Sequence, residues 1–277
     1  GTWSEGLLDD GKMDYKNGDI YTGKFLPHPD DGEQPEGKGV MEYHTGDVYY
    51  GNFQNGYKEG KGTMEYENGD RYEGGWEIDK KNGRGEMLYS DGARYVGRWV
   101  NDQRNGQGTM IVPWSGKKYV GGFRNDKANG YGKQFGPNEL LMYEGEFKDG
   151  KYDGYGRYFG GNGLLQYEGL WKNGKYDGFG EEFWRDDRDI KAPMYKGGFK
   201  DSEFDGFGLL ISHPDDGRIH INGKFKDGDL QGPAVIYDNN HRVIHKGEFD
   251  SKPWLEVIEE YIELSKKKKK STKKKAQ

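Results

Sequence analysis

The sequence predicts an all-β fold, an elongated and twisted antiparallel sheet built from tandem β-hairpin repeats. Three observations predict it: a short motif recurs along the chain, glycine and aromatic residues are abundant, and aliphatic residues are few. Only 31% of the 277 residues are hydrophobic, yet 15% are aromatic and 48 are glycine. Low hydrophobicity with high charge is typical of disorder, but disordered chains are poor in aromatic residues. We therefore expect many small aromatic clusters in a thin, extended structure.

The recurring motif is Tyr-x-Gly-x-aromatic, followed by a loop and then by Gly-x-Gly. One repeat reads Tyr49, Gly51 and Phe53, followed by Gly60 and Gly62. The lead tyrosines of the central repeats lie 23 or 24 residues apart. The candidate structural and binding surface consists of the same three positions in seven repeats: Tyr49, Gly51, Phe53, Tyr72, Gly74, Trp76, Tyr95, Gly97, Trp99, Tyr119, Gly121, Phe123, Tyr143, Gly145, Phe147, Tyr167, Gly169, Trp171, Tyr195, Gly197 and Phe199.

The motif is less regular at both ends of the chain. Tyr21 begins a repeat with a long loop, Ile221 replaces a lead tyrosine, and His245 begins a half-repeat. Degenerate terminal repeats are typical of the caps of an array. The segment from Gly1 to Gly6 aligns with the middle of a repeat, so we expect the natural protein to extend upstream.

Each repeat is expected to form two strands, in which alternation places the motif residues on one face. A glycine in a strand leaves space for a neighbouring ring to lie over the backbone. Asn17-Gly18, Asn68-Gly69 and Asp91-Gly92 predict two-residue type I′ turns, which need positive φ at both central residues. Asp149-Gly150 and Asn173-Gly174 indicate loops at the other edge of the sheet.

The repeat unit resembles the MORN repeat (membrane occupation and recognition nexus). The signature of that family is Tyr-Glu-Gly-x-Trp-x-x-Gly-x-x-x-Gly-x-Gly, and residues 167–180 match it position by position. The resemblance covers residues 1–250, which we expect to form the repeat array. It implies an elongated, twisted antiparallel sheet.

A different pattern follows the array. Residues 251–265 are expected to form a short amphipathic helix, because Pro253 suits a first turn and apolar residues recur at helical spacing. This helix either covers the last hairpin or binds a partner. Its candidate partner-binding face consists of Trp254, Val257, Ile258, Tyr261 and Ile262.

Residues 266–277 are expected to be a disordered tail. They hold eight lysines and no acidic residue, whereas residues 1–265 hold 34 basic and 48 acidic residues, a net charge of −14. The tail could attract anionic lipid at roughly 1 kcal/mol per lysine, or an acidic protein partner. We expect no specific nucleic-acid binding, and no stretch is apolar enough for a transmembrane segment.

Residues that carry chemistry are scarce. Cysteine is absent, none of the six histidines has metal-ligand spacing, and no Gly-x-Ser-x-Gly motif occurs. His-Pro-Asp-Asp-Gly occurs twice, at residues 28–32 and 213–217, where we favour turns over a metal site. The inserts at residues 26–36 and 184–193 are candidate partner contacts. We predict no enzyme activity, no cofactor and no metal.

The leading functional hypothesis is a non-catalytic scaffold that binds other proteins of a larger assembly. The family resemblance implies an intracellular, cytoskeletal setting, with the ciliary axoneme and its radial-spoke heads as the nearest analogy. One alternative is a membrane-tethering module that binds phosphoinositides, although a net charge of −14 on residues 1–265 opposes it. Another alternative is the accessory repeat region of a larger enzyme with an upstream catalytic domain.

Overall fold

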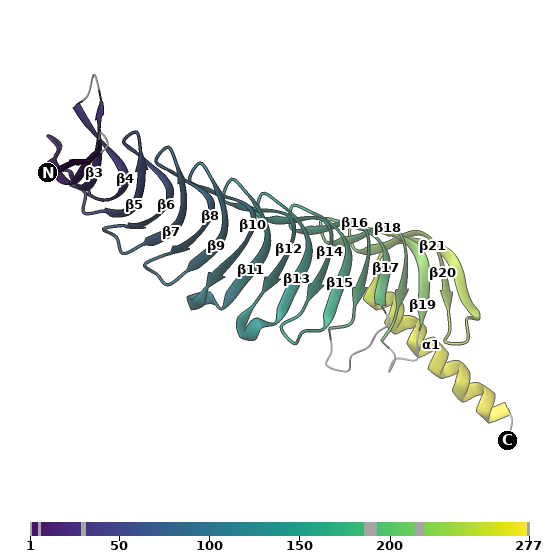
Figure 1. Ribbon diagram of the computed structural model, residues 1–277. Helices are drawn as coiled ribbons and strands as arrows, with labels where there is room; N and C mark the ends of the chain where they lie inside the picture. Colours follow the sequence, from purple (N-terminus) through teal and green to yellow (C-terminus); the bar gives the residue numbers. More distant parts are fainter. Residues whose placement is uncertain (1, 5–6, 29–31, 186–192, 214–218, 276–277) are drawn as a thin grey trace. The chain divides into compact units, whose positions relative to one another are not determined.

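Short antiparallel strands, each joined to the next by a turn, make up most of the fold (Figure 1). The computed structural model describes residues 2–4, 7–28, 32–185, 193–213 and 219–275. The chain divides into two units, Gly1–Glu139 (unit 1) and Leu140–Gln277 (unit 2). Within each unit the strands pair in the order of the sequence, which confirms the predicted all-β sheet of hairpin repeats.

Unit 1 contains two 3-10 turns besides its strands. Its elements are β1 (Thr2–Ser4), β2 (Leu7–Asp14), β3 (Ile20–His28), β4 (Gly32–Glu42), β5 (Val48–Gln54), β6 (Tyr57–Glu65), β7 (Arg71–Glu77), β8 (Lys80–Leu88), β9 (Arg94–Val100), β10 (Gln103–Val112), η1 (Pro113–Ser115), β11 (Lys117–Arg124), β12 (Lys127–Phe135) and η2 (Pro137–Glu139).

Unit 2 ends in the long helix of the chain. Its elements are β13 (Leu141–Lys148), β14 (Lys151–Phe159), β15 (Leu165–Lys172), β16 (Lys175–Phe183), β17 (Pro193–Lys200), β18 (Glu203–Ile211), β19 (His220–Lys226), β20 (Asp229–Tyr237), β21 (Val243–Pro253) and α1 (Trp254–Lys275).

A row of glycines crosses each sheet at the middle of its strands. Gly51 pairs with Gly39 on one side and with Gly62 on the other. In unit 1 the row continues through Gly74, Gly85, Gly97, Gly108, Gly121 and Gly132. In unit 2 it consists of Gly145, Gly156, Gly169, Gly180, Gly197, Gly208 and Gly223.

The lead tyrosine of each repeat lies over two glycines of this row. A Cβ atom added to Gly51 or Gly62 would lie 2.3 or 2.2 Å from the hydroxyl oxygen of Tyr49, so neither position has room for a side chain. The Tyr49 hydroxyl donates a hydrogen bond to the carbonyl of Asn52 at 3.1 Å. The same bond, to the carbonyl three residues ahead, recurs for Tyr21, Tyr72, Tyr95, Tyr119, Tyr143, Tyr167 and Tyr195.

Neighbouring repeats are joined by edge-to-face contacts between aromatic rings. The Tyr49 ring lies 5.1 Å from Phe53 of its own repeat and 5.3 Å from Trp76 of the next repeat. Such pairs contribute about 0.5–1.5 kcal/mol each beyond the burial of their area. The predicted motif aromatics are therefore the core. All of them are buried except Tyr119, which is half-buried.

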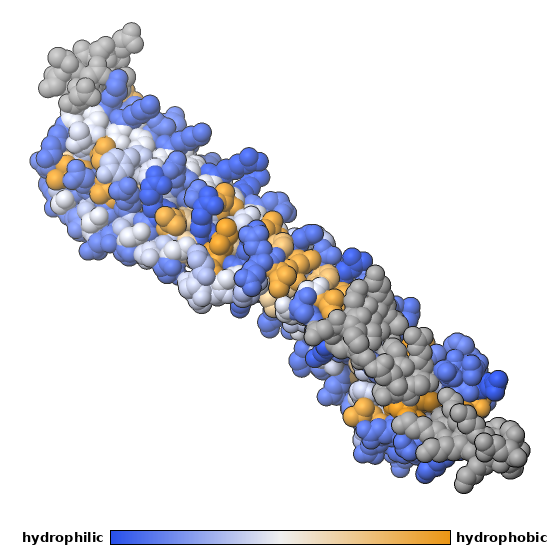
Figure 2. Space-filling model, turned by 90° about the horizontal axis from the view of Figure 1, so that it is seen from below, coloured by the Kyte–Doolittle hydropathy of each residue, from blue (hydrophilic) through white to orange (hydrophobic). Residues whose placement is uncertain are grey.

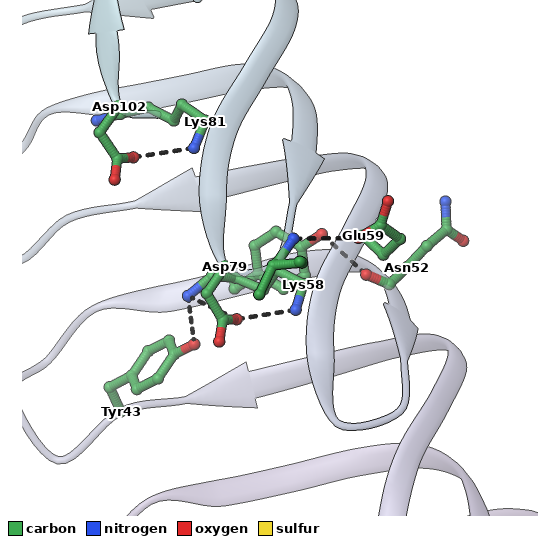
Figure 3. Close-up of polar contacts among 9 residues, drawn as sticks. Tyr43, Asn52, Lys58, Glu59, Asp79, Lys81 and Asp102 are labelled. Atoms are coloured by element: carbon green, nitrogen blue, oxygen red, sulfur yellow. Dashed lines mark hydrogen bonds and ion pairs between the residues drawn. The ribbon is translucent and has the colours of Figure 1, made fainter. Parts of the chain in front are cut away.

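In six repeats the residue nine positions after the lead tyrosine covers its ring, and the chemistry of this residue differs between the units. In unit 1 the Lys58 ammonium lies 5.1–5.8 Å from the ring centres of Tyr43, Tyr49 and Trp76. It also donates to the Tyr43 hydroxyl at 3.0 Å and lies 3.6 Å from Asp79 (Figure 3). The equivalent residues are Lys81, Arg104 and Ala128 in unit 1, and Tyr152, Tyr176 and Phe204 in unit 2.

In unit 2 the covering rings stack flat on the lead tyrosines. Tyr152 lies 3.7 Å from Tyr143 at an interplanar angle of 7°, and Phe204 lies 3.8 Å from Tyr195. A cation and a flat aromatic ring thus fill the same position over a tyrosine face.

The predicted positions of the type I′ turns were wrong. At Asn17-Gly18, Asn68-Gly69 and Asp91-Gly92 only the glycine has positive φ. In two of these turns the backbone N–H groups of Gly18 and Gly69 donate to the carbonyls of Tyr15 and Tyr66, three residues earlier. The hairpin loops are therefore longer than the predicted two residues. Both central residues have positive φ at the other edge of the sheets, for example at Asn101-Asp102 and Asn173-Gly174.

Helix α1 covers the last hairpins of unit 2, one of the two roles considered for it. Val257, Ile258 and Tyr261 are buried, and Trp254 and Ile262 are half-buried. The Trp254 ring lies 6.1 Å from Phe204 in β18, and the Tyr261 ring lies 5.4 Å from His245 in β21. Partner binding by this face remains a hypothesis, and it would require the helix to leave the sheet.

The boundaries of α1 differ from the expected ones. Strand β21 continues to Pro253, so the helix begins at Trp254, and it continues to Lys275 where a disordered tail was expected after residue 265. Lysine has a high intrinsic helix propensity, and cations are favoured near a helix C-terminus. These preferences account for a helical backbone through the lysines.

One core position of unit 2 holds a glutamate. Glu182 lies where other repeats have Met64 and Met87, and its side chain is 12% exposed. It accepts a hydrogen bond from Arg185 at 2.8 Å. Burial raises the pKa of the Glu182 carboxyl, and the neighbouring arginine offsets part of this increase.

Replacing Ile78 should stabilise the protein. Ile78 has φ of 45° and is 62% exposed, and a β-branched residue is strained in this left-handed region. We expect Ile78→Asn to raise the free energy of unfolding by about 1 kcal/mol, measured by urea denaturation. Ile78→Val keeps the branched Cβ and is the matched control. An equal gain in both variants would show that backbone strain is not the cause.

Neutralising Glu182 should stabilise the protein in a pH-dependent way. At about pH 7 we expect Glu182→Gln to gain about 1 kcal/mol, because the buried carboxylate is desolvated. The gain should shrink toward about pH 5, since Glu182 takes up its proton in the folded protein before it does so in the unfolded chain. Thermal denaturation of both proteins at the two pH values measures this difference.

The control for this experiment is Glu181→Gln. Glu181 is 31% exposed and pairs with Lys196 at 2.7 Å on the opposite face of β16. We expect no gain at either pH in this variant. A Glu182→Gln gain that stays constant with pH would contradict the proposed desolvation.

Candidate interaction surface

On the face of each sheet opposite the aromatic core, two residues of each strand flank the glycine row. Alternation along β5, for example, buries Tyr49 and Phe53 and leaves Tyr50 and Asn52 on the other face. We call one of these two positions the groove row: the residue between the two glycines of Gly-x-Gly, and the residue in register with it in the following strand, as Lys61 is with Gly75. In the described strands of unit 1 the groove row includes Lys38, Asn52, Lys61, Gly75, Arg84, Arg98, Gln107, Gly122 and Tyr131.

Four of the nine groove-row residues named for unit 1 are basic and none is acidic, and the row lines two cavities. A cavity of about 930 Å³ is lined by Arg84, Arg98 and Gln107, with Glu73 and Glu86 beside them. A second cavity of about 660 Å³ is lined by Lys38, Asn52 and Lys61 among others. Because the row runs beside glycines, backbone forms much of the floor.

The groove row of unit 2 is mainly apolar. It includes Glu146, Tyr155, Leu170, Phe179, Gly198, Phe207 and Lys224. Tyr155 is in register with Leu170, and the exposed fractions of Tyr155, Leu170, Phe179 and Phe207 are 49%, 42%, 56% and 68%. Figure 2 shows one face of the molecule, on which apolar patches interrupt a mostly hydrophilic surface.

The tyrosine hydroxyls of the core form structural hydrogen bonds. Burial raises the pKa of Tyr66, Tyr95 and Tyr119 to about 12, so their hydroxyls stay protonated near neutral pH. The Tyr95 and Tyr119 hydroxyls donate to backbone carbonyls, and the Tyr66 hydroxyl accepts from Lys81. On the groove face, a hydrogen bond from Tyr155 to Glu168 raises the pKa of the Tyr155 hydroxyl.

Two properties of the described residues bear on other functions. No group of three or more histidine, aspartate or glutamate side chains there could hold a metal ion. Within the same residues, no helix combines the length and the apolar character that crossing a bilayer requires.

The predicted site residues lie in the core, in a hairpin extension or outside the described residues. The motif residues lie in the core and do not form the exposed groove row. The His-Pro-Asp-Asp-Gly segments lie largely outside the described residues, as does most of the insert at residues 184–193. The insert at residues 26–36 extends the β3–β4 hairpin, where His28 is in register with Gly32.

Sequence reasoning missed the groove row, although the sequence contains a signal for it. The residue between the two glycines of each Gly-x-Gly is Lys61, Arg84 or Gln107 in unit 1 and Tyr155, Phe179 or Phe207 in unit 2. Alternation places that residue on the face opposite the core.

Comparisons with solved structures find weak likenesses. The TCP10 domain of Danio rerio CPAP in complex with a peptide of Danio rerio STIL is 11% identical, with 87% of this chain and 100% of that chain covered and a TM-score of 0.23. The SAS-4 (dCPAP) TCP domain of Drosophila melanogaster, in complex with a proline-rich motif of Ana2 (dSTIL), is 9% identical, with coverage of 87% and 90% and a TM-score of 0.22. Likenesses at these TM-scores carry no argument about function. No curated protein sequence matches the chain significantly.

A family model gives the decisive comparison. The model of the MORN repeat matches residues 34–48, 49–71, 72–94, 95–115, 119–139, 143–164, 167–187 and 195–213. These segments include the lead tyrosines from Tyr49 to Tyr195 and together make up more than half of the chain. The chain therefore belongs to the MORN-repeat family.

Proposed function

We propose that this protein is a non-catalytic scaffold that holds partner proteins along the groove face of its repeats. The observation that carries the proposal is the apolar groove row of unit 2. Tyr155, Leu170, Phe179 and Phe207 are 42–68% exposed and take no part in the aromatic core. Apolar side chains that gather on a polar surface mark protein-binding sites, and aromatic residues are enriched in such interfaces.

The chemistry of the described residues also supports a non-catalytic role. A catalytic site needs groups with perturbed pKa values gathered in an accessible pocket. The largest tyrosine pKa increases belong to buried lead tyrosines, for example Tyr49 and Tyr72, whose hydroxyls donate hydrogen bonds within the core.

The proposed setting is a cytoskeletal assembly inside the cell, with the ciliary axoneme and its radial-spoke heads as the specific case. The support is the family resemblance, since MORN arrays of this kind are expected in such assemblies. Imaging of the tagged full chain in its native cell tests this setting. Axonemal or cortical staining would support it, and diffuse staining would contradict it.

The apolar groove row should be needed for partner binding. We expect Phe179→Asp with Phe207→Asp to abolish most partners found by proximity labelling in the native cell, since both side chains are exposed and a charge there prevents apolar contact. The matched control is Leu255→Asp, because Leu255 is 53% exposed on α1, away from the groove. Unchanged partners in the double variant would contradict the proposal.

The alternative function, a membrane tether, has one specific observation in its favour. The last twelve residues hold eight lysines and no acid, so they could bind anionic lipid. We expect vesicles rich in phosphatidylserine to float the full chain at low salt and to lose it when residues 266–277 are removed. Salt-resistant flotation of residues 1–265 would instead favour a membrane function of the repeats.

A further inference from the structure

Two arginines of unit 1 face each other without an acidic partner. Arg84 in β8 and Arg98 in β9 are in register on the groove face, and both are exposed. Neither guanidinium has a hydrogen bond or ion pair to any described residue. Like charges directly opposite each other destabilise a sheet. The pair therefore has an electrostatic cost that no direct ion pair within the described residues offsets.

The nearest acidic residues are already paired with other arginines. Glu73 accepts from Arg71 at 2.8 Å, and Glu86 accepts from Arg94 at 2.5 Å. Both glutamates line the same cavity of about 930 Å³ as the unpaired arginines. The cavity thus has a cationic floor beside acidic groups that are neutralised. Its free charge is positive even though the chain as a whole is acidic.

The same pattern continues along the groove. Lys61 in β6 and Lys38 in β4 line the second cavity, are exposed, and likewise form no ion pair within the described part of the chain. Lys38, Lys61 and Arg84 lie on alternate strands. Since neighbouring strands lie about 4.8 Å apart, successive cations recur about every 9.5 Å across the sheet.

That spacing fits a particular conformation of a bound chain. A polyproline II segment has three residues per turn and rises about 9.3 Å per turn, so every third side chain projects to the same side. Carboxylates at every third position would therefore meet successive cations, and the guanidinium forks of Arg84 and Arg98 suit carboxylate recognition.

We propose that the groove of unit 1 binds an extended acidic segment of a partner protein, with Asp or Glu at every third residue. This inference rests on the proposed scaffold function and names one partner class for it. A flat membrane surface fits the groove less well than an extended chain does, because Arg84 and Arg98 line a cavity that a flat surface cannot enter.

A designed peptide tests the proposal with the full chain. The probe is a fluorescein-labelled peptide of four Glu-Pro-Ser triplets, and the control peptide has the same composition with its glutamates adjacent. We expect the triplet peptide to bind more tightly by fluorescence anisotropy. Arg84→Gln with Arg98→Gln should weaken binding by about tenfold or more, and added salt should weaken it further.

The matched control variant is Arg124→Gln with Lys127→Gln, which makes the same change in charge at an exposed edge of unit 1. It should bind the triplet peptide nearly as well as the unchanged protein, and circular dichroism should show that both variants fold. Equal weakening in the two double variants, or equal binding of the two peptides, would overturn the inference.

Two further outcomes separate this inference from its alternatives. Competition by inorganic phosphate, at a concentration equal to that of the peptide's carboxylates, would overturn it in favour of a small-anion site. Arginine-dependent binding to phosphatidylserine vesicles without peptide binding would overturn it in favour of a membrane site. Loss of peptide binding in the arginine variant with cellular partners unchanged would support the peptide site but show that it is not the main scaffold surface. Failure of the Phe179 and Phe207 test leaves the peptide measurement unaffected, so the two proposals fail separately.

Discussion

The packing of one tyrosine ring on two paired glycines is the constraint on which each sheet depends. A single-layered sheet has no second sheet to bury its side chains. Here the Tyr49 ring lies against the backbone at Gly51 and Gly62, where any side chain would collide with it. The hydroxyl then donates to the carbonyl of Asn52, which satisfies the polar end of a buried ring. Each repeat thus builds its own small core, and ring contacts with the next repeat join these cores.

This arrangement determines which face can bind. Because the core uses the motif side chains on one face, the opposite face carries residues that the fold does not constrain. Arg84 and Phe179 are in equivalent positions of different repeats, yet one is a cation and the other an aromatic ring. The same backbone can therefore present different chemistry in each repeat. A scaffold that holds several partners side by side requires this freedom.

The motif predicted the core and the hairpin order, because tyrosine and glycine are placed by local packing that recurs in every repeat. The turn types were harder to predict. Asn68-Gly69 and Asn173-Gly174 have the same residues, but only the second pair has positive φ at both positions. The difference comes from the number of residues between the paired strands. The groove row was missed for another reason: the Gly-x-Gly pattern marks its positions, but the fold leaves the residue types at those positions open, so no single residue type is common to them.

The type of residue that covers a lead tyrosine goes together with the type of one turn residue in the next repeat. The strand-connecting turn of the next repeat holds Asp79 for Lys58 and Asp102 for Lys81. These carboxylates accept hydrogen bonds from the backbone N–H groups of the two lysines at 2.8 and 2.9 Å. Where Tyr152 provides the cover, the equivalent turn residue is Gly174, whose N–H donates to the Tyr152 carbonyl.

A cation in this position therefore occurs with an aspartate at the second position of the corresponding turn, whereas an aromatic ring occurs with glycine or serine there. Replacing Asp79 alone would leave the ammonium of Lys58, 11% exposed, with only tyrosine and ring contacts, and a partly buried charge without its counterion is destabilising. Replacing Lys58 alone by tyrosine would leave an exposed aspartate at a turn, where it is readily solvated. Exchanging the cationic cover of unit 1 for the aromatic cover of unit 2 is thus less destabilising when the covering lysine is replaced first and the turn aspartate second.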